Sequence, residues 1–195
     1  MIKPKEIIRV GFILFVITAI SALLLAYAND ITAPIIEKNN KIKTENSMKT
    51  LIPEADEFQE QGNAYIAKAG GETVGVCVIS EGLGYGGTVQ VMVGVDKTGK
   101  VAGVDILSHS ETPGLGANAD KPEFTNQFTG KTGNIKVTKG GSGENEINAI
   151  SGATVTSNAV TGAVNEALSI AEEILGTGNG TEADAVSGAT VKSEK

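Results

Sequence analysis

The chain has 195 residues and a formal net charge of −7. No basic stripe follows its first nine residues, which argues against nucleic-acid binding, because that function needs clustered lysine and arginine. Its one cysteine excludes an internal disulfide, and its one histidine lacks the cysteine or second histidine that a zinc site would need. We therefore expect no metal site and no nucleic-acid partner.

The first element is an apolar segment at residues 10–28, VGFILFVITAISALLLAYA, which contains no charge and no proline. At ~1.5 Å per helical residue, it nearly crosses a hydrocarbon core of ~30 Å. Lysine and arginine precede it and Asp30 follows it, so the positive-inside rule predicts a single transmembrane helix, with residues 1–9 in the cytoplasm and the main domain outside. The alternative is a cleaved signal peptide, with residues 26–28 (Ala-Tyr-Ala) as its cleavage site.

A connecting helix is predicted over residues 29–53. Pro34 allows a new helix to start beyond the membrane, and spaced apolar positions follow from Ile35 to Leu51. Pro53 then ends the helix, because the residue before a proline disfavours helical backbone.

The domain at residues 54–175 begins with short apolar runs separated by glycine, a pattern typical of strands. Four strands are expected, at 64–67, 73–80, 88–95 and 101–107, with a hairpin turn at 96–99. Phe124 and Phe128 predict a short helix, and residues 135–138 a further short strand. The expected fold class is α+β, with an antiparallel sheet packed against helices.

The clearest helix of the domain covers residues 157–175, whose apolar residues fall on one face, and Gly176 suits its end. Cys77 lies in an expected strand and is predicted to be a small buried hydrophobic residue. Residues 176–195 are rich in glycine, threonine, serine and charge, which predicts a flexible tail.

Ser151, Gly152, Ala153 and Thr154 form the candidate site, because they lie at or just before the start of this helix. A helix N-terminus presents unpaired N–H groups and the positive end of the dipole, which suit a phosphate. The small residues let a ligand approach the backbone, and Thr156 adds a hydroxyl. Plain N-capping explains the same residues without a ligand. A threonine with no neighbouring base is a poor nucleophile, so any covalent bond at Thr154 would be installed by another enzyme.

Residues 147–157, INAISGATVTS, resemble the flavinylation motif of the FMN-binding domain family. That family includes the G subunit of the Rnf complex and the C subunit of the sodium-translocating NADH:quinone reductase. In it, a dedicated flavin transferase joins the phosphate of FMN to the motif threonine as a phosphodiester. The resemblance implies a covalent FMN on Thr154, with Ser151, Gly152, Ala153 and Thr156 around it.

A second motif supports the resemblance. Residues 109–116, HSETPGLG, are similar to the family's Glu-Thr-Pro-Gly-Leu-Gly loop, which lies against the flavin. This implies cofactor contacts from Glu111, Thr112, Gly114 and Leu115, although turn-shaping alone also explains the proline and glycine. The adjacent His109 could be a proton donor near the flavin or a surface residue, and the second interpretation is preferred. Residues 84–87 (GYGG) and 51–53 (LIP) also fit the pattern of the Rnf G subunit.

The chain departs from the family pattern in two ways. Asn148 stands where the family usually has aspartate, which keeps the hydrogen-bonding shape and loses the charge. Residues 184–193, DAVSGATVKS, nearly repeat the motif, so Thr190 is a possible second attachment site for FMN or a duplication without function.

The resemblance implies an electron-transfer subunit with covalent FMN in a membrane-bound, ion-translocating ferredoxin:NAD oxidoreductase (Rnf) complex. Such a chain would be a redox subunit without catalytic residues of its own, held in the inner membrane by a single span. Its partners would be the other membrane and redox subunits, and the flavin transferase during maturation. The alternatives are the C subunit of the quinone reductase, a free-standing flavinylated protein on the membrane, and a membrane-tethered binding module without flavin.

Overall fold

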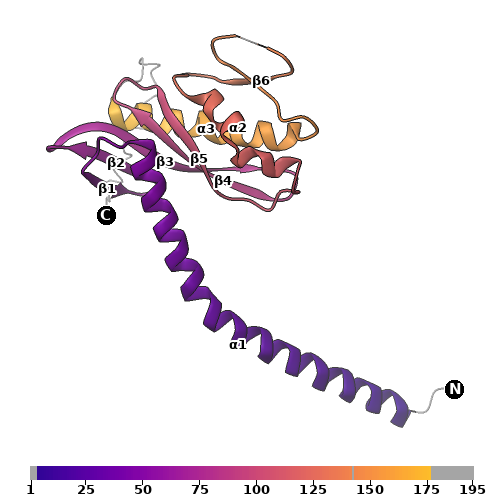
Figure 1. Cartoon of the computed structure of the whole chain (residues 1–195). Helices are drawn as coiled ribbons and strands as arrows, with labels where there is room; N and C mark the ends of the chain where they lie inside the picture. Colours follow the sequence, from indigo (N-terminus) through magenta and orange to yellow (C-terminus); the bar gives the residue numbers. More distant parts are fainter. Residues whose placement is uncertain (1–3, 142, 177–195) are drawn as a thin grey trace, which may run out of the picture.

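The computed structural model describes residues 4–141 and 143–176, and Figure 1 shows one long helix that leads to a sheet covered by helices. The first part of the chain forms α1 (Pro4–Leu51), β1 (Glu57–Gln61), β2 (Ala64–Ala69), β3 (Glu72–Leu83), β4 (Thr88–Asp96) and β5 (Val101–Ser108). The second part forms η1 (Gly116–Asp120), α2 (Pro122–Thr125), η2 (Asn126–Phe128), β6 (Lys136–Thr138), β7 (Glu146–Asn148) and α3 (Thr154–Leu175). The tail predicted beyond Gly176, with Thr190, lies outside the described residues.

Helix α1 continues through Pro34, so no separate connecting helix starts there. An internal proline removes one backbone hydrogen bond and bends a helix without having to end it, and Figure 1 shows α1 bent along its length. The helix ends at Leu51, just ahead of Pro53, as predicted. Over the described part of the chain, α1 is the one helix long and apolar enough to cross a membrane, which makes it a candidate span.

The five longer strands form one antiparallel sheet in the order β1-β2-β3-β4-β5, which confirms the predicted fold class. The four predicted strands are β2 to β5, within a few residues at each end. Strand β1 was not predicted, because its sequence EFQEQ is polar and lies on the exposed edge of the sheet. Strand β7, also unpredicted, pairs in parallel with β6, which was predicted.

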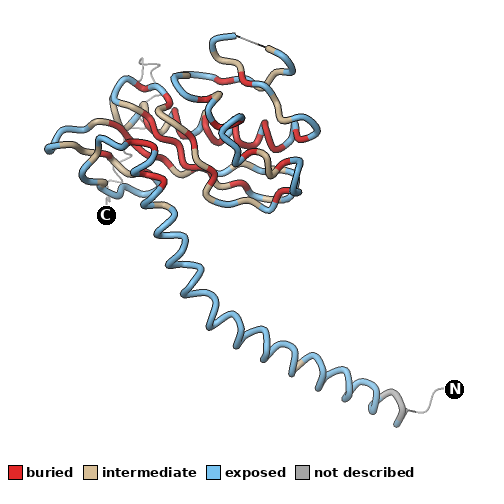
Figure 2. Tube along the Cα trace, viewed as in Figure 1, coloured by how far each residue is buried: buried red, intermediate tan, exposed pale blue. Residues whose placement is uncertain are grey.

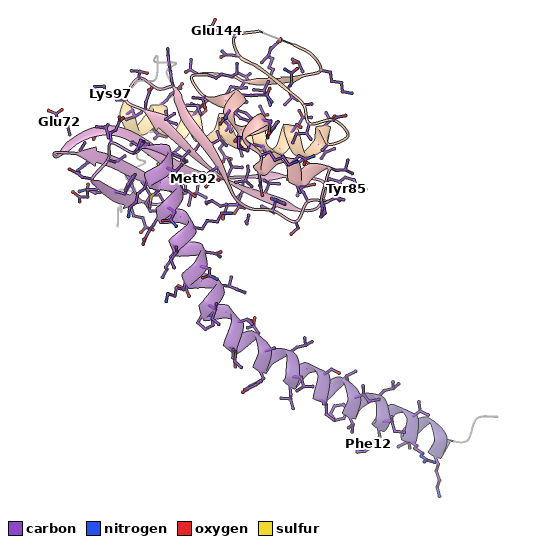
Figure 3. All side chains as sticks on the ribbon, in the orientation of Figure 1. Phe12, Glu72, Tyr85, Met92, Lys97 and Glu144 are labelled. Carbon is purple, nitrogen blue, oxygen red and sulfur yellow. The ribbon has the colours of Figure 1, made fainter. Side chains whose placement is uncertain are left out.

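The two faces of the sheet carry different parts of the core, because successive side chains of a strand point to opposite sides. Val76 and Val78 pack with α3, whereas Cys77 between them joins a second cluster beneath the end of α1. Met92 belongs to this second cluster, and Figure 3 labels it beside the end of α1. Figure 2 shows the result as buried residues in the sheet and in α3, with α1 exposed for most of its length.

The last turn of α1 is docked closely on the sheet, over glycines from three neighbouring strands. A β-carbon at Gly94 would lie 2.8 Å from Leu51 Cβ, and one at Gly103 would lie 2.9 Å from Leu51 Cδ2. At Gly75 it would lie 2.5 Å from the Val95 carbonyl oxygen and 2.8 Å from Ile52 Cδ1, just beyond the helix. Glycine at these positions lets the helix end approach the strands more closely than any other residue would.

Polar contacts join α1 to the end of β5. Lys43 Nζ donates hydrogen bonds to the carbonyl oxygens of Ile106 (2.9 Å) and Leu107 (2.6 Å), and the Ser47 hydroxyl donates to the carboxylate of Asp105. The chain leaves β5 at Ser108 and continues directly into the loop that contains Glu111. The docked helix and the candidate site are therefore connected through one strand.

Candidate functional site

The start of α3 forms the centre of the site. Ala153 occupies the N-cap position and makes no side-chain capping bond, while Thr154 is the first helical residue and is exposed. Plain N-capping by serine or threonine therefore does not account for the motif. The first turn leaves the N–H groups of Thr154, Val155 and Thr156 without intrahelical acceptors, beside the positive end of a 22-residue helix. This arrangement favours an anion next to the Thr154 hydroxyl.

The turn before α3 is held by Ser157. The Ile150 N–H donates to Ser157 Oγ at 2.9 Å, and Ser157 Oγ–H donates to the Ala153 carbonyl at 2.9 Å. Gly152 has φ +76°, and a β-carbon there would lie 3.2 Å from Leu115 Cδ2. The local sequence therefore needs glycine at 152 for its backbone and serine at 157 for its hydrogen bonds.

A pocket of about 810 Å³ opens at this helix start, and three further segments complete its lining. They are Tyr85 from the β3–β4 connection, part of the loop at 111–116, and residues 139–140. Its volume lies within the range usual for cofactor-sized ligands. Segments far apart in the sequence thus meet around Thr154, and Tyr85 lies at one end of the domain, opposite Glu72 and Lys97 (Figure 3).

The structure brings eight of the nine predicted cofactor-site residues to this pocket: Ser151, Gly152, Ala153, Thr154, Thr156, Glu111, Thr112 and Leu115. The ninth, Gly114, does not line it. Gly114 has φ +78°, and its carbonyl accepts a hydrogen bond from Asn118 Nδ2 at 2.9 Å, so it shapes the turn of the loop.

Glu111 is buried, with 7% of its surface accessible, whereas the other residues of the 110–115 loop are exposed. Its Oε1 accepts a hydrogen bond from the Gly86 N–H at 3.1 Å. A β-carbon at Gly84 would clash with Oε1, and one at Gly116 would clash with Oε2. The carboxylate is therefore fixed between the Gly84–Gly87 connection and the start of η1.

Thr156 adds a polar group to the same part of the pocket. Its side chain is 1% exposed, and within residues 4–141 and 143–176 its Oγ1 is the one buried side-chain oxygen or nitrogen without a hydrogen-bond partner. A β-carbon at Gly116 would lie 2.7 Å from this oxygen, so the Thr156 hydroxyl and Glu111 Oε2 border the same small space. Because buried polar groups are normally paired, the unpaired hydroxyl fits a site that receives a polar ligand.

His109 supports the loop from behind. Its Nδ1 accepts the Glu111 N–H at 3.1 Å, so that nitrogen carries no proton, and its Nε2–H donates to Asp120 at 3.0 Å. Its side chain is 17% exposed, so this partly exposed histidine contacts the backbone of Glu111 from the edge of the domain.

Asn148 closes the glycine-rich loop between β6 and β7. Its Oδ1 accepts the Gly140 N–H at 2.8 Å, and its Nδ2 donates to the Gly141 carbonyl at 3.3 Å. Gly140 and the exposed Lys139 line the pocket. The amide that replaces the family's usual aspartate therefore holds a loop that borders the site.

Sequence reasoning did not assign several residues of the pocket. Those residues are Tyr85, Gly116, Lys139, Gly140, Ala149, Ile150 and Val155. Tyr85 and Gly116 lie within motifs that had been recognised as wholes, which was the available signal. Lys139 and Gly140 belong to no recognised motif, and they follow β6, whose pairing with β7 the sequence did not predict.

Comparison with known proteins agrees with this geometry. Residues 84–169 match the FMN-binding domain family, and residues 1–51 match the RnfG N-terminal region. The G subunit of the sodium-translocating ferredoxin:NAD oxidoreductase complex of Acetobacterium woodii is 36% identical, over 87% of this chain and 94% of that protein. The G subunit of the proton-translocating ferredoxin:NAD oxidoreductase complex of Clostridium ljungdahlii is 39% identical, over 76% of this chain and 83% of that protein.

Two solved structures share the fold. The C subunit of the sodium-translocating NADH-quinone reductase from Parabacteroides distasonis superposes with a TM-score of 0.50 at 29% identity, covering 60% of this chain and 63% of that one. NqrC from Shewanella oneidensis superposes with a TM-score of 0.52 at 21% identity, covering 65% of this chain and 73% of that one. The second likeness concerns the fold alone.

Proposed function

This chain belongs to the RnfG family, the G subunits of ion-translocating oxidoreductase complexes, and we propose that it carries FMN on Thr154 through a phosphodiester and relays electrons within such a complex. The observation that carries the proposal is the position of Thr154. Its exposed hydroxyl lies at the first residue of α3, inside a pocket of cofactor size.

The residues of the pocket fit both parts of FMN. The N–H groups that open α3 suit the negative charge that a phosphodiester keeps at neutral pH. Tyr85, Leu115 and Val155 offer apolar surface to a flat ring, and the unpaired Thr156 hydroxyl offers a hydrogen bond. The flavin supplies the redox chemistry, and the chain binds and orients it. Since Thr154 lies in a pocket without histidine, the bond is expected to be made by a separate flavin transferase.

The test is fluorescence of denaturing gels under ultraviolet light, with the full chain co-expressed with a flavin transferase. Wild type is expected to give a fluorescent band and Thr154→Ala a weaker one, with the remaining band abolished in Thr154→Ala/Thr190→Ala. Thr161→Ala is the matched control, because Thr161 is on the same helix, is buried and donates to the Ser157 carbonyl at 2.7 Å. A band of wild-type strength in Thr154→Ala would refute attachment at this residue.

We also propose Thr190 as a second attachment site, on the strength of the repeated sequence at 184–193. The intact mass of a Thr154→Val variant separates the possibilities. One FMN on this variant, lost again in Thr154→Val/Thr190→Val, is the expected result. A Thr154→Val protein of unmodified mass would leave residues 187–190 as a duplication without function.

The setting is the second part of the proposal. We expect residues 10–28 to span the membrane, with residues 1–9 in the cytoplasm and the domain outside. The other subunits of an ion-translocating ferredoxin:NAD oxidoreductase complex would be its partners. Co-purification of those subunits with the tagged chain supports this setting, whereas a flavinylated chain that purifies alone from its native membrane supports a free-standing electron carrier.

A further inference from the structure

We propose that the Glu111 carboxylate lowers the reduction potential of the flavin in this pocket. The inference rests on the proposed function, since it needs a flavin in the pocket. The inference goes beyond the proposed function because it states which side chain controls how readily the bound flavin accepts electrons.

The first step is that Glu111 is fixed at the pocket rather than free in solvent. It is 7% exposed and lines the pocket, and the backbone at Gly84 and Gly116 approaches its two oxygens too closely for any β-carbon. The Gly86 N–H holds Oε1 at 3.1 Å. The carboxylate is therefore held at the lining of the pocket by this hydrogen bond and by the glycines that leave room for it.

The second step is that no neighbouring positive charge cancels Glu111. Among the residues that the structure describes, the carboxylates that contact a lysine or histidine side chain within ion-pair distance are Glu37 and Asp120, and Glu111 is not one of them. His109 behind it presents Nδ1 to the backbone N–H of Glu111, and its Nε2 contacts Asp120 rather than the Glu111 carboxylate. Lys139 is the cation that lines the pocket, but its side chain is exposed to solvent, where its charge is strongly screened.

The third step is the response of the flavin. Reduction adds electrons to the ring system, and a fixed negative charge nearby opposes this addition because the pocket is less polar than water. Oε2 borders the same space as the Thr156 hydroxyl, which has no hydrogen-bond partner in the protein. The carboxylate therefore lies in the part of the pocket where a polar group of the ligand is expected. A neutral side chain of the same shape would remove the opposition and leave the pocket intact.

The experiment measures the midpoint potential of the bound flavin by reductive titration of the full chain in detergent. Glu111→Gln keeps an oxygen that can accept from Gly86 and removes the charge. Its potential is expected to shift to a more positive value. Glu146→Gln is the matched control, because Glu146 also accepts one glycine N–H, that of Gly143 at 3.1 Å, and does not line the pocket. Its potential is expected to equal that of wild type.

An unchanged or more negative potential in Glu111→Gln overturns the proposal. So does a folded Glu111→Gln protein that takes up no flavin, because a residue that only tunes the potential is not needed for binding. If Glu111→Gln fails to fold, Glu111→Asp decides: a smaller positive shift is required, since the charge retreats by one methylene, and an unchanged potential overturns the idea. The denaturing gel separates the proposals, because a coloured wild type without a covalent band refutes the linkage and still allows the comparison of potentials.

Discussion

Ser157→Ala tests whether the turn that presents Thr154 depends on one buried hydroxyl. Ser157 is fully buried, and its Oγ joins the Ile150 N–H to the Ala153 carbonyl, both at 2.9 Å. Alanine removes both bonds and leaves the Ile150 N–H without this acceptor. The Ala153 carbonyl keeps its backbone bond from the Ser157 N–H at 3.0 Å.

The expected magnitude follows from these contacts. A donor left unsatisfied in a partly buried position costs about 1–3 kcal/mol. Alanine recovers a few tenths of a kcal/mol, roughly, through its higher helix propensity. We therefore expect the free energy of unfolding to fall by about 2 kcal/mol, and flavin attachment at Thr154 to fall as well, although the threonine itself is unchanged.

The assay uses the chain's single cysteine. Cys77 is fully buried, so a thiol reagent modifies it only when the domain opens, and its reaction in increasing urea reports unfolding of the full chain in detergent. Ser169→Ala is the matched control, because Ser169 also donates to the carbonyl four residues earlier, is exposed, and holds no loop. Equal urea midpoints for the two variants would refute the assigned role of Ser157.

Three further perturbations follow from the structure. Burial raises the pKa of the Cys77 thiol from 9.0 to about 12, so the folded state holds a proton that the unfolded state releases above pH 9. Stability is thus expected to fall by about 1.4 kcal/mol per pH unit between these values in wild type but not in Cys77→Ala, in urea titrations followed by circular dichroism. Gly94→Ala should destabilise the domain by about 1–3 kcal/mol, because its β-carbon would lie 2.8 Å from Leu51 Cβ. Gly162→Ala, on the open face of α3, is the control and should not destabilise it. Equal urea midpoints for the two variants would contradict the close docking of α1. Asn148→Asp keeps the acceptor for Gly140 and loses the donor to Gly141, so we expect less than about 1 kcal/mol of destabilisation and undiminished flavin fluorescence on gels; loss of that fluorescence would show that the amide donor is essential.

The sequence predicted those parts of the fold whose local pattern reflects their burial. Strands β2 to β5 and helix α3 have regular apolar spacing because each buries one or both faces, and Gly176 ends α3 with φ +67° as expected. Strand β1 escaped prediction because an exposed edge strand needs no apolar residues. The helix start expected at Pro34 was absent, since proline bends a long helix as readily as it ends one.

The features of the candidate site also fall into those that the sequence predicts and those that it does not. Motif residues such as Thr154 and Glu111 could be named before the structure was known, because their neighbours in the sequence are also their neighbours in the pocket. The burial of Glu111, the unpaired hydroxyl of Thr156 and the approach of Lys139 could not, because each depends on contacts between segments well separated in the sequence. Local sequence shows which residues are available, and tertiary packing decides which of them share a space.

The route from α1 to the pocket connects the candidate membrane span to the proposed cofactor site. A flexible linker between the apolar segment and the domain would leave the pocket free to reorient, but here the helix runs without interruption to Leu51 and is buried there against β4 and β5. Lys43 holds the last carbonyl groups of β5, and the chain then enters the loop in which His109 positions Glu111. One strand and a short loop thus connect the end of the helix to Glu111. The residues that anchor α1 to the sheet therefore belong to the same structural unit as the residues proposed to set the flavin's potential.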